Sequence, residues 1–330
     1  MGNKVWKRSV WLVAAGLMLG MLPGCSLLRP FGYIDTQGNE AIPAGFSVAG
    51  SFVGEYAPVM QLQVSTQLWG FINREGRIVI EPTFLSVRPF SEGLAPVQAS
   101  GSGDPWIFID EEGVQVVPGL FGDASVFVGG LAPVQQQDGD KRYGFINKQG
   151  EYIIEPQFYL ASVFSQDEGL AVVMPEQGSL MGYISTKGGI VIEPQFAYAG
   201  TFAEGLATVK MSNVQGRDDW GAINTLGEVV IPCEFGEIGR FSGGLAPACK
   251  MDEETKTRLW GFIDAQGQWV IEPQYTSADT FSAEGLAAVN TGTVDKPRWG
   301  FVNTDGSVAI EPRFSGAGTF NGGLAPANLG

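Results

Sequence analysis

The chain has 330 residues, of which 47 are Gly and 19 are Pro, a share that argues against long helices. Its 44% hydrophobic and 11% aromatic content is too high for an intrinsically disordered chain, so a packed β-rich protein is expected. The chain has no histidine, which excludes His-based acid–base catalysis, Ser-His-Asp triads and His-ligated metals. We therefore expect no enzyme activity, no catalytic residue, no cofactor and no metal.

The N-terminal residues are typical of a secretory signal. Three basic residues within the first eight precede an apolar stretch, residues 10–22, that is shorter than the ~18 residues needed to span a bilayer. Leu22-Pro23-Gly24-Cys25 then resembles the lipobox of bacterial lipoproteins. The resemblance implies cleavage between Gly24 and Cys25 and acyl chains on Cys25, so that residues 1–24 are a signal peptide and residues 25–30 a lipidated tether.

These features predict an exported protein that is lipid-anchored at the cell envelope, and at the outer membrane if the host has one, because Ser rather than Asp follows Cys25. Residues 1–24 hold three basic and no acidic residues, so the mature chain has 17 Lys and Arg against 35 Asp and Glu, a formal net charge of −18. An acidic surface repels phosphate groups, so we expect no nucleic-acid partner and membrane contact through the acyl chains alone.

One sequence unit recurs eight times between residues 31 and 330. A Trp-Gly pair opens the unit, and the leucine of a Gly-Leu-Ala segment follows 24 residues after the glycine in most copies. The units span approximately residues 31–68, 69–105, 106–142, 143–180, 181–219, 220–259, 260–298 and 299–330. The positions predicted to form the repeat core are Trp69, Gly70, Trp106, Tyr143, Gly144, Gly182, Trp220, Gly221, Trp260, Gly261, Trp299 and Gly300.

Each unit is predicted to form about three strands. In the second unit, residues 69–72 alternate as a strand, residues 73–76 supply the Asx residue and glycine of a hairpin, and residues 78–80 return. Pro82 lacks an N–H and should end the returning strand. The third strand, residues 94–97, contains a proline, which favours an edge position in the sheet.

A Glu-Pro pair ends the second strand of five units. Because an active site is normally built once, we interpret the five glutamates as capping or solvent-facing residues repeated with their unit. They are Glu81, Glu155, Glu193, Glu272 and Glu311. No other pair of carboxylates is singled out for glycoside hydrolysis.

Most aromatic residues fall at four repeated positions, those of Trp69, Phe71, Phe84 and Phe90 in the second unit. Repetition at fixed positions indicates a core role. Six aromatic residues of the mature chain lie elsewhere and are either casually packed or available for an exposed stacking surface. They are Phe46, Tyr56, Tyr152, Tyr159, Tyr198 and Trp269.

The segment before each Trp-Gly pair varies in length. The longest copies are residues 210–219 and 250–259. A partner-specific surface is best sought there, with tolerated insertion in exposed loops as the alternative interpretation.

Cys233 and Cys249 both lie in the unit of residues 220–259. Cys249 ends the predicted third strand of this unit. An exported protein meets an oxidising compartment, so a local disulfide between them is one interpretation. Two buried free thiols are the other.

The units resemble WG repeats, also called KWG repeats, a bacterial family named for the Trp-Gly pair. Departures from the pattern are Phe31 and Met181 in place of Trp, Ile107 in place of Gly, and Pro118 and Pro232 without a preceding Glu, and these units are expected to pack less regularly. The resemblance implies a β-rich repeat array with a binding or scaffolding role and no shared catalytic activity.

The sequence thus predicts an all-β fold of eight tandem WG-type repeats of about 38 residues. We prefer closure into a β-propeller because closure removes exposed sheet edges; the usual four-stranded blade and the irregular first unit favour an open β-solenoid instead. The predicted function is a membrane-anchored extracytoplasmic binding or scaffold module for an unknown protein or cell-envelope glycan. The alternatives are a passive structural spacer and a carboxylate-dependent hydrolase.

Overall fold

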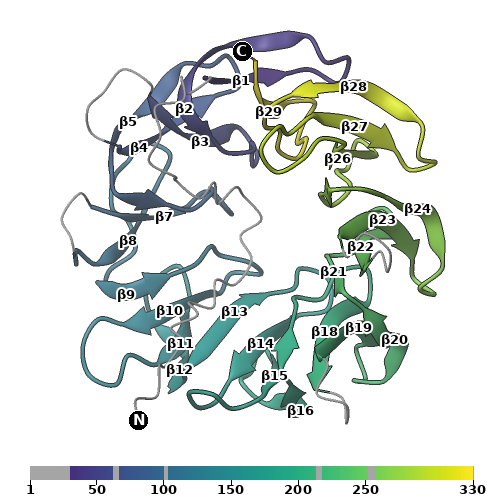
Figure 1. Cartoon of the computed structure of the whole chain (residues 1–330). Coiled ribbons are helices and arrows are strands. Elements are labelled where there is room, and N and C mark those ends of the chain that lie inside the picture. The colour runs from purple at the N-terminus through teal and green to yellow at the C-terminus, as the bar shows by residue number, and fades with distance from the viewer. Residues whose placement is uncertain (1–29, 62–66, 100–102, 213–217, 252–256, 330) are drawn as a thin grey trace, which may run out of the picture.

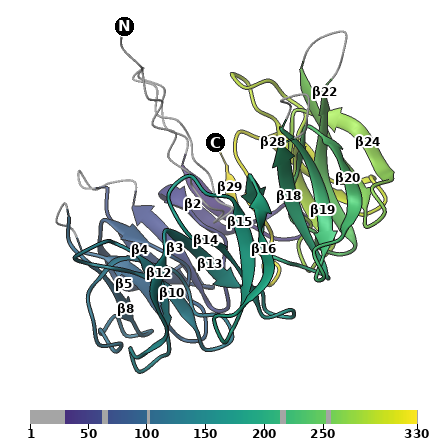
Figure 2. The ribbon, with the colours of Figure 1, turned by 90° about the horizontal axis from the view of Figure 1, so that it is seen from below.

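The computed structural model describes residues 30–61, 67–99, 103–212, 218–251 and 257–329, and within these ranges it contains strands and turns but no helix. The strands form six antiparallel sheets arranged in a ring (Figure 1). Seen from below, the ring is bent, with β3–β16 on one side and β18–β28 on the other (Figure 2). The predicted signal peptide and Cys25 lie outside the described residues.

The regular building block is a four-stranded module made from two consecutive sequence units. In β25 (Ser277–Ala278), β26 (Leu286–Asn290), β27 (Trp299–Asn303) and β28 (Val308–Phe314), the first two strands come from one unit and the last two from the next. The short first strand was missed from sequence because two residues carry no periodicity. The module therefore has four strands, as propeller blades usually do.

Three further sheets have the same plan. They are β13 (Leu160–Phe164), β14 (Leu170–Met174), β15 (Met181–Ser185) and β16 (Ile190–Phe196); β17 (Tyr198–Ala199), β18 (Leu206–Ser212), β19 (Asp218–Asn224) and β20 (Val229–Phe235); and β21 (Glu237–Ile238), β22 (Leu245–Met251), β23 (Arg258–Asp264) and β24 (Trp269–Tyr275). Returning strands such as β20 and β24 lie on the outside of the ring, and short strands such as β21 lie toward its centre (Figure 1).

The two remaining sheets are larger because a single strand serves two modules. One contains β29 (Ala325–Asn328), β1 (Phe31–Ile34), β2 (Glu40–Ala49), β3 (Tyr56–Gln61), β4 (Trp69–Asn73) and β5 (Ile78–Phe84). The other contains β6 (Ser86–Val87), β7 (Ala95–Gln98), β8 (Trp106–Ile109), β9 (Phe121–Ala124), β10 (Ala132–Gln136), β11 (Tyr143–Ile146) and β12 (Tyr152–Phe158). The shared strands are β2 and β9, each of which pairs with strands of two modules.

The ring closes by pairing the first strand with the last. β1 and β29 are antiparallel, with Phe31 opposite Asn328 and Ile34 opposite Ala325. The first module is thus completed by the last sequence unit, and the closed propeller-like fold preferred from sequence is confirmed.

The proline of the third strand does not mark an edge, so that prediction is wrong. β7 lies between β6 and β8. The Pro96 carbonyl accepts a hydrogen bond of 2.9 Å from the backbone N–H of Arg88, just beyond the end of β6. In an antiparallel pair, the nitrogen and the carbonyl of one residue point toward the same neighbouring strand. The missing N–H of Pro96 therefore points toward the chain beyond the end of β6, where no strand hydrogen bond is lost. An inner strand tolerates proline here for that reason.

The Glu-Pro pair also does not end its strand. β5 continues to Phe84, and three residues of β5 oppose one of β4 between the pairs Phe71–Ile80 and Trp69–Phe84. Pro82 therefore sits in a bulge of an outermost strand, where no neighbour requires its N–H. The five repeated glutamates are all exposed, as expected for solvent-facing residues.

The glycine of the Trp-Gly pair faces this bulge at close range. A Cβ atom on Gly144 would lie 2.5 Å from the Ile154 carbonyl oxygen and 2.8 Å from the Pro156 nitrogen. The same crowding recurs at Gly182, Gly221, Gly261 and Gly300. Glycine is required because the returning backbone occupies the space that a side chain would need.

The unit without this glycine is the irregular one. Ile107 takes the glycine position in β8, and β8 pairs with β9 only through Trp106 and Phe121, apart from an isolated bridge between Ile109 and Gln115. Irregular packing was predicted correctly for this unit. It was wrong for the units of Met181 and Pro232, whose strands β15, β16 and β20 pair with the same register and bulge as the unit of Trp69.

The core lies between neighbouring modules. Phe71 and Phe90 are buried with ring centroids 4.8 Å apart, and the equivalent pair Phe301 and Phe320 is separated by 4.7 Å. The Trp side chains are half-buried rather than buried, and each lies within the first three residues of its strand. Those at the predicted repeat-core positions are Trp69, Trp106, Trp220, Trp260 and Trp299, with Tyr143 in the same environment.

The two faces of the ring differ. We call one the turn face: it carries the tight turns before the third strands and the hairpins after the Trp-Gly strands. We call the other the loop face: it carries the ends of the third strands and the starts of the Trp-Gly strands. Phe31 begins β1 and Asn328 ends β29, so both lie on the loop face.

Candidate functional site

A pocket of about 330 Å³ opens on the turn face between two adjacent tight turns and one hairpin. Its lining residues are Val53, Gly54, Glu55, Tyr56, Phe90, Ser91, Glu92, Gly93 and Glu111. We call it the turn pocket. Its volume is at the small end of ligand-binding cavities, which suits one side chain or a similar small group.

The two turns of the pocket are held by short backbone bonds. The N–H of Val53 donates to the Tyr56 carbonyl, and the N–H of Ser91 donates to the Leu94 carbonyl, each at 2.9 Å. Seven of the eight units carry leucine at the position of Tyr56. The tyrosine is half-buried, and its ring lies 5.0 Å from that of the buried Phe90. An aromatic wall is therefore particular to this pocket.

The polar lining is acidic. The Tyr56 hydroxyl donates to Glu111 Oε2 at 3.0 Å. Burial, the hydrogen bond to Glu111 and the neighbouring carboxylates raise the pKa of Tyr56 above its ordinary value, so it remains a neutral donor. None of the residues that line the pocket is basic.

Two of the lining carboxylates have cationic partners outside the pocket. Glu92 lies 3.1 Å from Lys148 Nζ and also accepts from the Gly130 N–H, and Glu55 lies 3.5 Å from Arg74 Nε. Glu111 has a neutral hydroxyl as its partner and no ion pair among the described residues. Its charge is therefore the one that the protein leaves uncompensated at this site.

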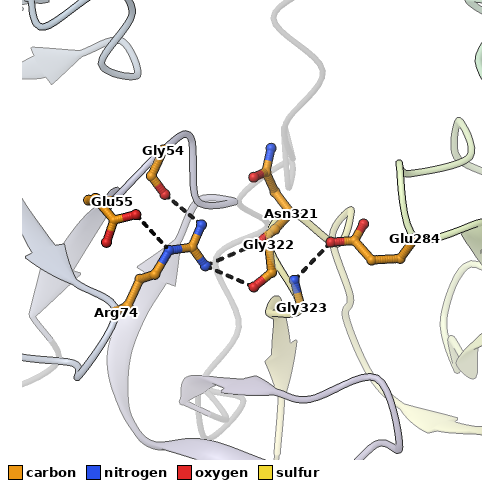
Figure 3. A network of polar contacts seen from close by, with 7 residues as sticks. All are labelled: Gly54, Glu55, Arg74, Glu284, Asn321, Gly322 and Gly323. Carbon is orange, nitrogen blue, oxygen red and sulfur yellow. Dashed lines mark hydrogen bonds and ion pairs between the residues drawn. The ribbon is translucent and has the colours of Figure 1, made fainter.

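Arg74 connects the pocket to the closure of the ring (Figure 3). Its guanidinium donates to the carbonyls of Gly322 at 3.0 Å and Gly54 at 2.5 Å, which belong to the last and first turns of the chain. On the far side of the same turn, the Gly323 N–H donates to Glu284 Oε1 at 2.8 Å. The wall beside Glu55 is thus part of a network that spans the seam of the ring.

The second residue of the hairpin differs between adjacent units. Arg74 holds this position in the second unit and Lys148 in the fourth, and each donates to a turn carbonyl, that of Gly322 and that of Glu92 respectively. These two carbonyls are equivalent in the repeat. In the third unit, which lies between them, the position is Glu111. The turn pocket therefore has a carboxylate where both flanking units have a cation.

The structure does not bring the two cysteines into a bridge; both are free. Cys233 lies on β20 with its sulfur against Gly221, whereas Cys249 lies on β22 with its sulfur against Gly236. The two strands belong to neighbouring modules, and each thiol packs against a glycine. Burial is the main cause that raises the pKa of both thiols, and that of Cys249 reaches about 11.

The remaining predicted site residues are distributed round the ring. The Trp-Gly positions are structural and do not converge on a site. Gly24, Cys25 and the central parts of the two longest variable segments, residues 213–217 and 252–256, lie outside the described residues. Of the six separate aromatic residues, Tyr159 is exposed and Phe46 is buried, while Tyr56, Tyr152, Tyr198 and Trp269 are half-buried. Only Tyr56 lines the pocket.

Within the described part of the chain, no helix is long and apolar enough to cross a membrane. The same residues contain no group of three or more Cys, Asp or Glu side chains placed to hold a metal ion. The turn pocket thus offers carboxylate acceptors beside an aromatic wall.

The eight units match the family model for the WG containing repeat at residues 31–62, 69–101, 106–139, 143–174, 181–214, 220–252, 260–292 and 299–330. The chain belongs to the WG containing repeat family. No curated protein matches this WG repeat chain. A ring of WG repeats is a rigid scaffold of the kind used in protein-interaction or structural modules.

Solved structures similar to this WG repeat chain include propellers of proteases. Prolyl oligopeptidase B from Galerina marginata has a TM-score of 0.57 at 9% identity, over 87% of this chain and 51% of that one, so the WG repeat chain matches about half of it. The β-propeller domain of the Trilobed protease from Pyrococcus furiosus, which has an open velcro topology, has a TM-score of 0.51 at 9% identity, over 80% of this chain and 97% of that one. At these identities the likeness shows the fold alone.

Sequence reasoning missed Glu92 and Glu111 as site residues. The signal was present in the repeat alignment, where Glu111 is the only acidic residue at its hairpin position and tyrosine replaces leucine at a fixed turn position. Tyr56 and Glu111 meet in space because the hairpin of the third unit contacts the turn of the first unit. The sequence of a single unit does not encode this contact.

Proposed function

We propose that this protein is an exported, lipid-anchored binding module that carries no catalytic activity and presents its turn face to a partner in the cell envelope. The observation that carries the proposal is the turn pocket, the place where two departures from the repeat pattern, Tyr56 and Glu111, come together. Repeats that serve only as spacers have no need for such a departure. The partner is a protein or an envelope glycan.

The course of the chain supports this orientation. Phe31 starts β1 on the loop face, six residues after Cys25, and even a fully extended chain of that length spans only about 20 Å. With Cys25 acylated, the loop face is held close to the membrane. The turn face then points away from the bilayer, toward partners in the envelope.

Anchoring is tested by fractionation of cells that express the full chain or Cys25→Ser. We expect the wild type in the membrane fraction and the variant in the soluble fraction, because the acyl chains require the Cys25 thiol. A Cys233→Ser chain is the matched control and should remain at the membrane. Membrane association of Cys25→Ser would contradict lipid anchoring.

Binding is tested by crosslinking and capture from envelope extract with the full chain in detergent. We expect a partner that the wild type retains and that Tyr56→Leu loses, since this change gives the pocket the residue of the other seven turns. Tyr159→Leu is the control, because Tyr159 is exposed but lies outside the pocket. Capture of no partner, or equal capture by both variants, would contradict binding through the turn face.

A further inference from the structure

We propose that the turn pocket binds the cationic side chain of a protein partner, a lysine or an arginine. This inference rests on the proposed function, because it names the chemistry of the partner that the turn face receives. It is drawn from the comparison of three consecutive units of the same ring.

The two flanking units show what a cation does at the position of Glu111; the other five units carry Thr or Ala there. In the second and fourth units, Arg74 and Lys148 donate to turn carbonyls, and Lys148 also pairs with the Glu92 carboxylate. In the third unit, a carboxylate takes this place and faces the Tyr56 hydroxyl. The hairpins on both sides of the pocket thus carry a cation, whereas the hairpin that lines the pocket carries a carboxylate.

The charges around the pocket favour a positive group from outside. Glu111 has no ion pair among the described residues, and Glu55, at the pocket rim, has a side chain that is 74% exposed and a partner at the long distance of 3.5 Å. A cation that enters between them can donate charge-assisted hydrogen bonds to the carboxylates. The negative charge of the whole protein steers such a group toward the surface.

The shape and the aromatic wall favour an amino-acid side chain over a bare ion. The half-buried ring of Tyr56 lies beside the exposed Val53, so the pocket has apolar surface for an aliphatic stem next to its carboxylates. A cation above an aromatic ring gains further attraction. Lysine and arginine combine an aliphatic stem with a charged end, and a volume of about 330 Å³ accommodates one such side chain.

The test uses the full chain in detergent and a fluorescein-labelled peptide of alternating Gly and Lys, with binding followed by fluorescence anisotropy at about 0.15 M salt, where distant charges are screened. Glu111→Lys gives the hairpin the residue type of its neighbours and should weaken binding about tenfold or more. Tyr56→Leu should also weaken it. Glu272→Lys makes the same change of net charge at an exposed site on β24 and should leave binding unchanged. The peptide acetylated at every Lys Nζ should not bind.

Three results would overturn the inference. Equal loss in Glu111→Lys and Glu272→Lys would show that net charge, not the pocket, attracts the peptide. Failure of the wild type to bind the lysine peptide would contradict the proposal that the partner is cationic. Binding of a glucosamine oligomer at the pocket without binding of the peptide would place an amino glycan there instead. If the peptide fails while Tyr56→Leu still loses an envelope partner in the capture experiment, this inference falls and the proposed function stands.

Discussion

The guanidinium of Arg74 donates to the carbonyl oxygen of Gly322 at 3.0 Å, although the two residues are 248 positions apart in the chain. The contact joins the hairpin of the second unit to the turn of the last unit, across the seam where β1 meets β29 (Figure 3). Arg74 also lies 5.0 Å from the centroid of the Phe52 ring. One side chain therefore links the first and last turns of the chain, beside the pairing of β1 with β29.

Replacement of this side chain should loosen the seam. We expect Arg74→Ala to lower the free energy of unfolding by about 1.5–3 kcal/mol, because hydrogen bonds from a charged donor to two turns are lost. Arg77→Ala is a matched control in the same hairpin: the Arg77 side chain is 75% exposed and, among the described residues, forms an ion pair only with Glu75, so its loss should cost less than about 0.5 kcal/mol. Urea unfolding of both variants checks the difference, and equal midpoints would contradict the role of Arg74.

The Trp-Gly glycine should resist even the smallest side chain. Gly144→Ala places a methyl group against the Ile154 carbonyl and the Pro156 nitrogen, so we expect a loss of about 1–3 kcal/mol in the free energy of unfolding. Gly45→Ala is the control, because the nearest atom to its added Cβ is 4.0 Å away. The urea midpoint of Gly45→Ala should stay close to that of the wild type. A tolerated Gly144→Ala would contradict the proposed reason for the repeat signature.

Glu284 makes the seam sensitive to acid. Burial opposes ionisation of this carboxylate, but hydrogen bonds from Gly323, Ser282 and neighbouring backbone hold its pKa below the ordinary 4.5. A lowered pKa in the folded state means that the contribution to stability is present above pH 4.5 and is lost as the pH falls through the folded pKa. We expect Glu284→Gln to be less stable than the wild type by about 1 kcal/mol at neutral pH. The difference should shrink in acid.

Glu272→Gln on the exposed face of β24 is the control for this pH series. Its urea midpoint should follow the wild type at every pH. A Glu284→Gln difference that is constant from neutral pH down to about pH 3 would show that charge is not what Glu284 contributes.

The two thiols should react slowly and separately. Because burial raises the pKa of Cys249 to about 11, its thiolate fraction at about pH 8 is roughly a hundredfold below that of an ordinary thiol. We expect iodoacetamide to modify the half-buried Cys233 before Cys249 in the folded chain, and both readily in urea. Peptide mapping by mass spectrometry checks the order. A Cys233–Cys249 bridged peptide under non-reducing conditions would contradict the free thiols of the structure.

Repetition made the fold predictable, and exceptions to repetition define the candidate site. The hairpins at Gly76 and Gly150, the buried Phe71 and the exposed Glu81 follow from patterns that recur in register. Each is a local property of one unit. The eightfold count and the all-β class were accessible for the same reason.

What could not be read from one unit is the way consecutive units interlock. Proline alone favours an edge, but Pro96 lies in an inner strand: its neighbour β6 is only two residues long, and its other neighbour β8 comes from the next unit. Pro82 was assigned to a strand end because a bulge is not visible in a hydrophobic pattern. The meeting of Tyr56 with Glu111 requires two neighbouring modules, built from three sequence units, in their final places.

The pairing of β1 with β29 has a consequence for how the protein is made. The first strand leaves the ribosome at the start of synthesis, but its partner is the last strand to appear. Neighbouring modules can form as the chain lengthens, because their contacts are local, whereas the first module waits for a strand almost 300 residues away. Until then the exposed edge of β1 is open to pairing with other chains. With export as proposed above, the ring closes only after β29 has crossed the membrane.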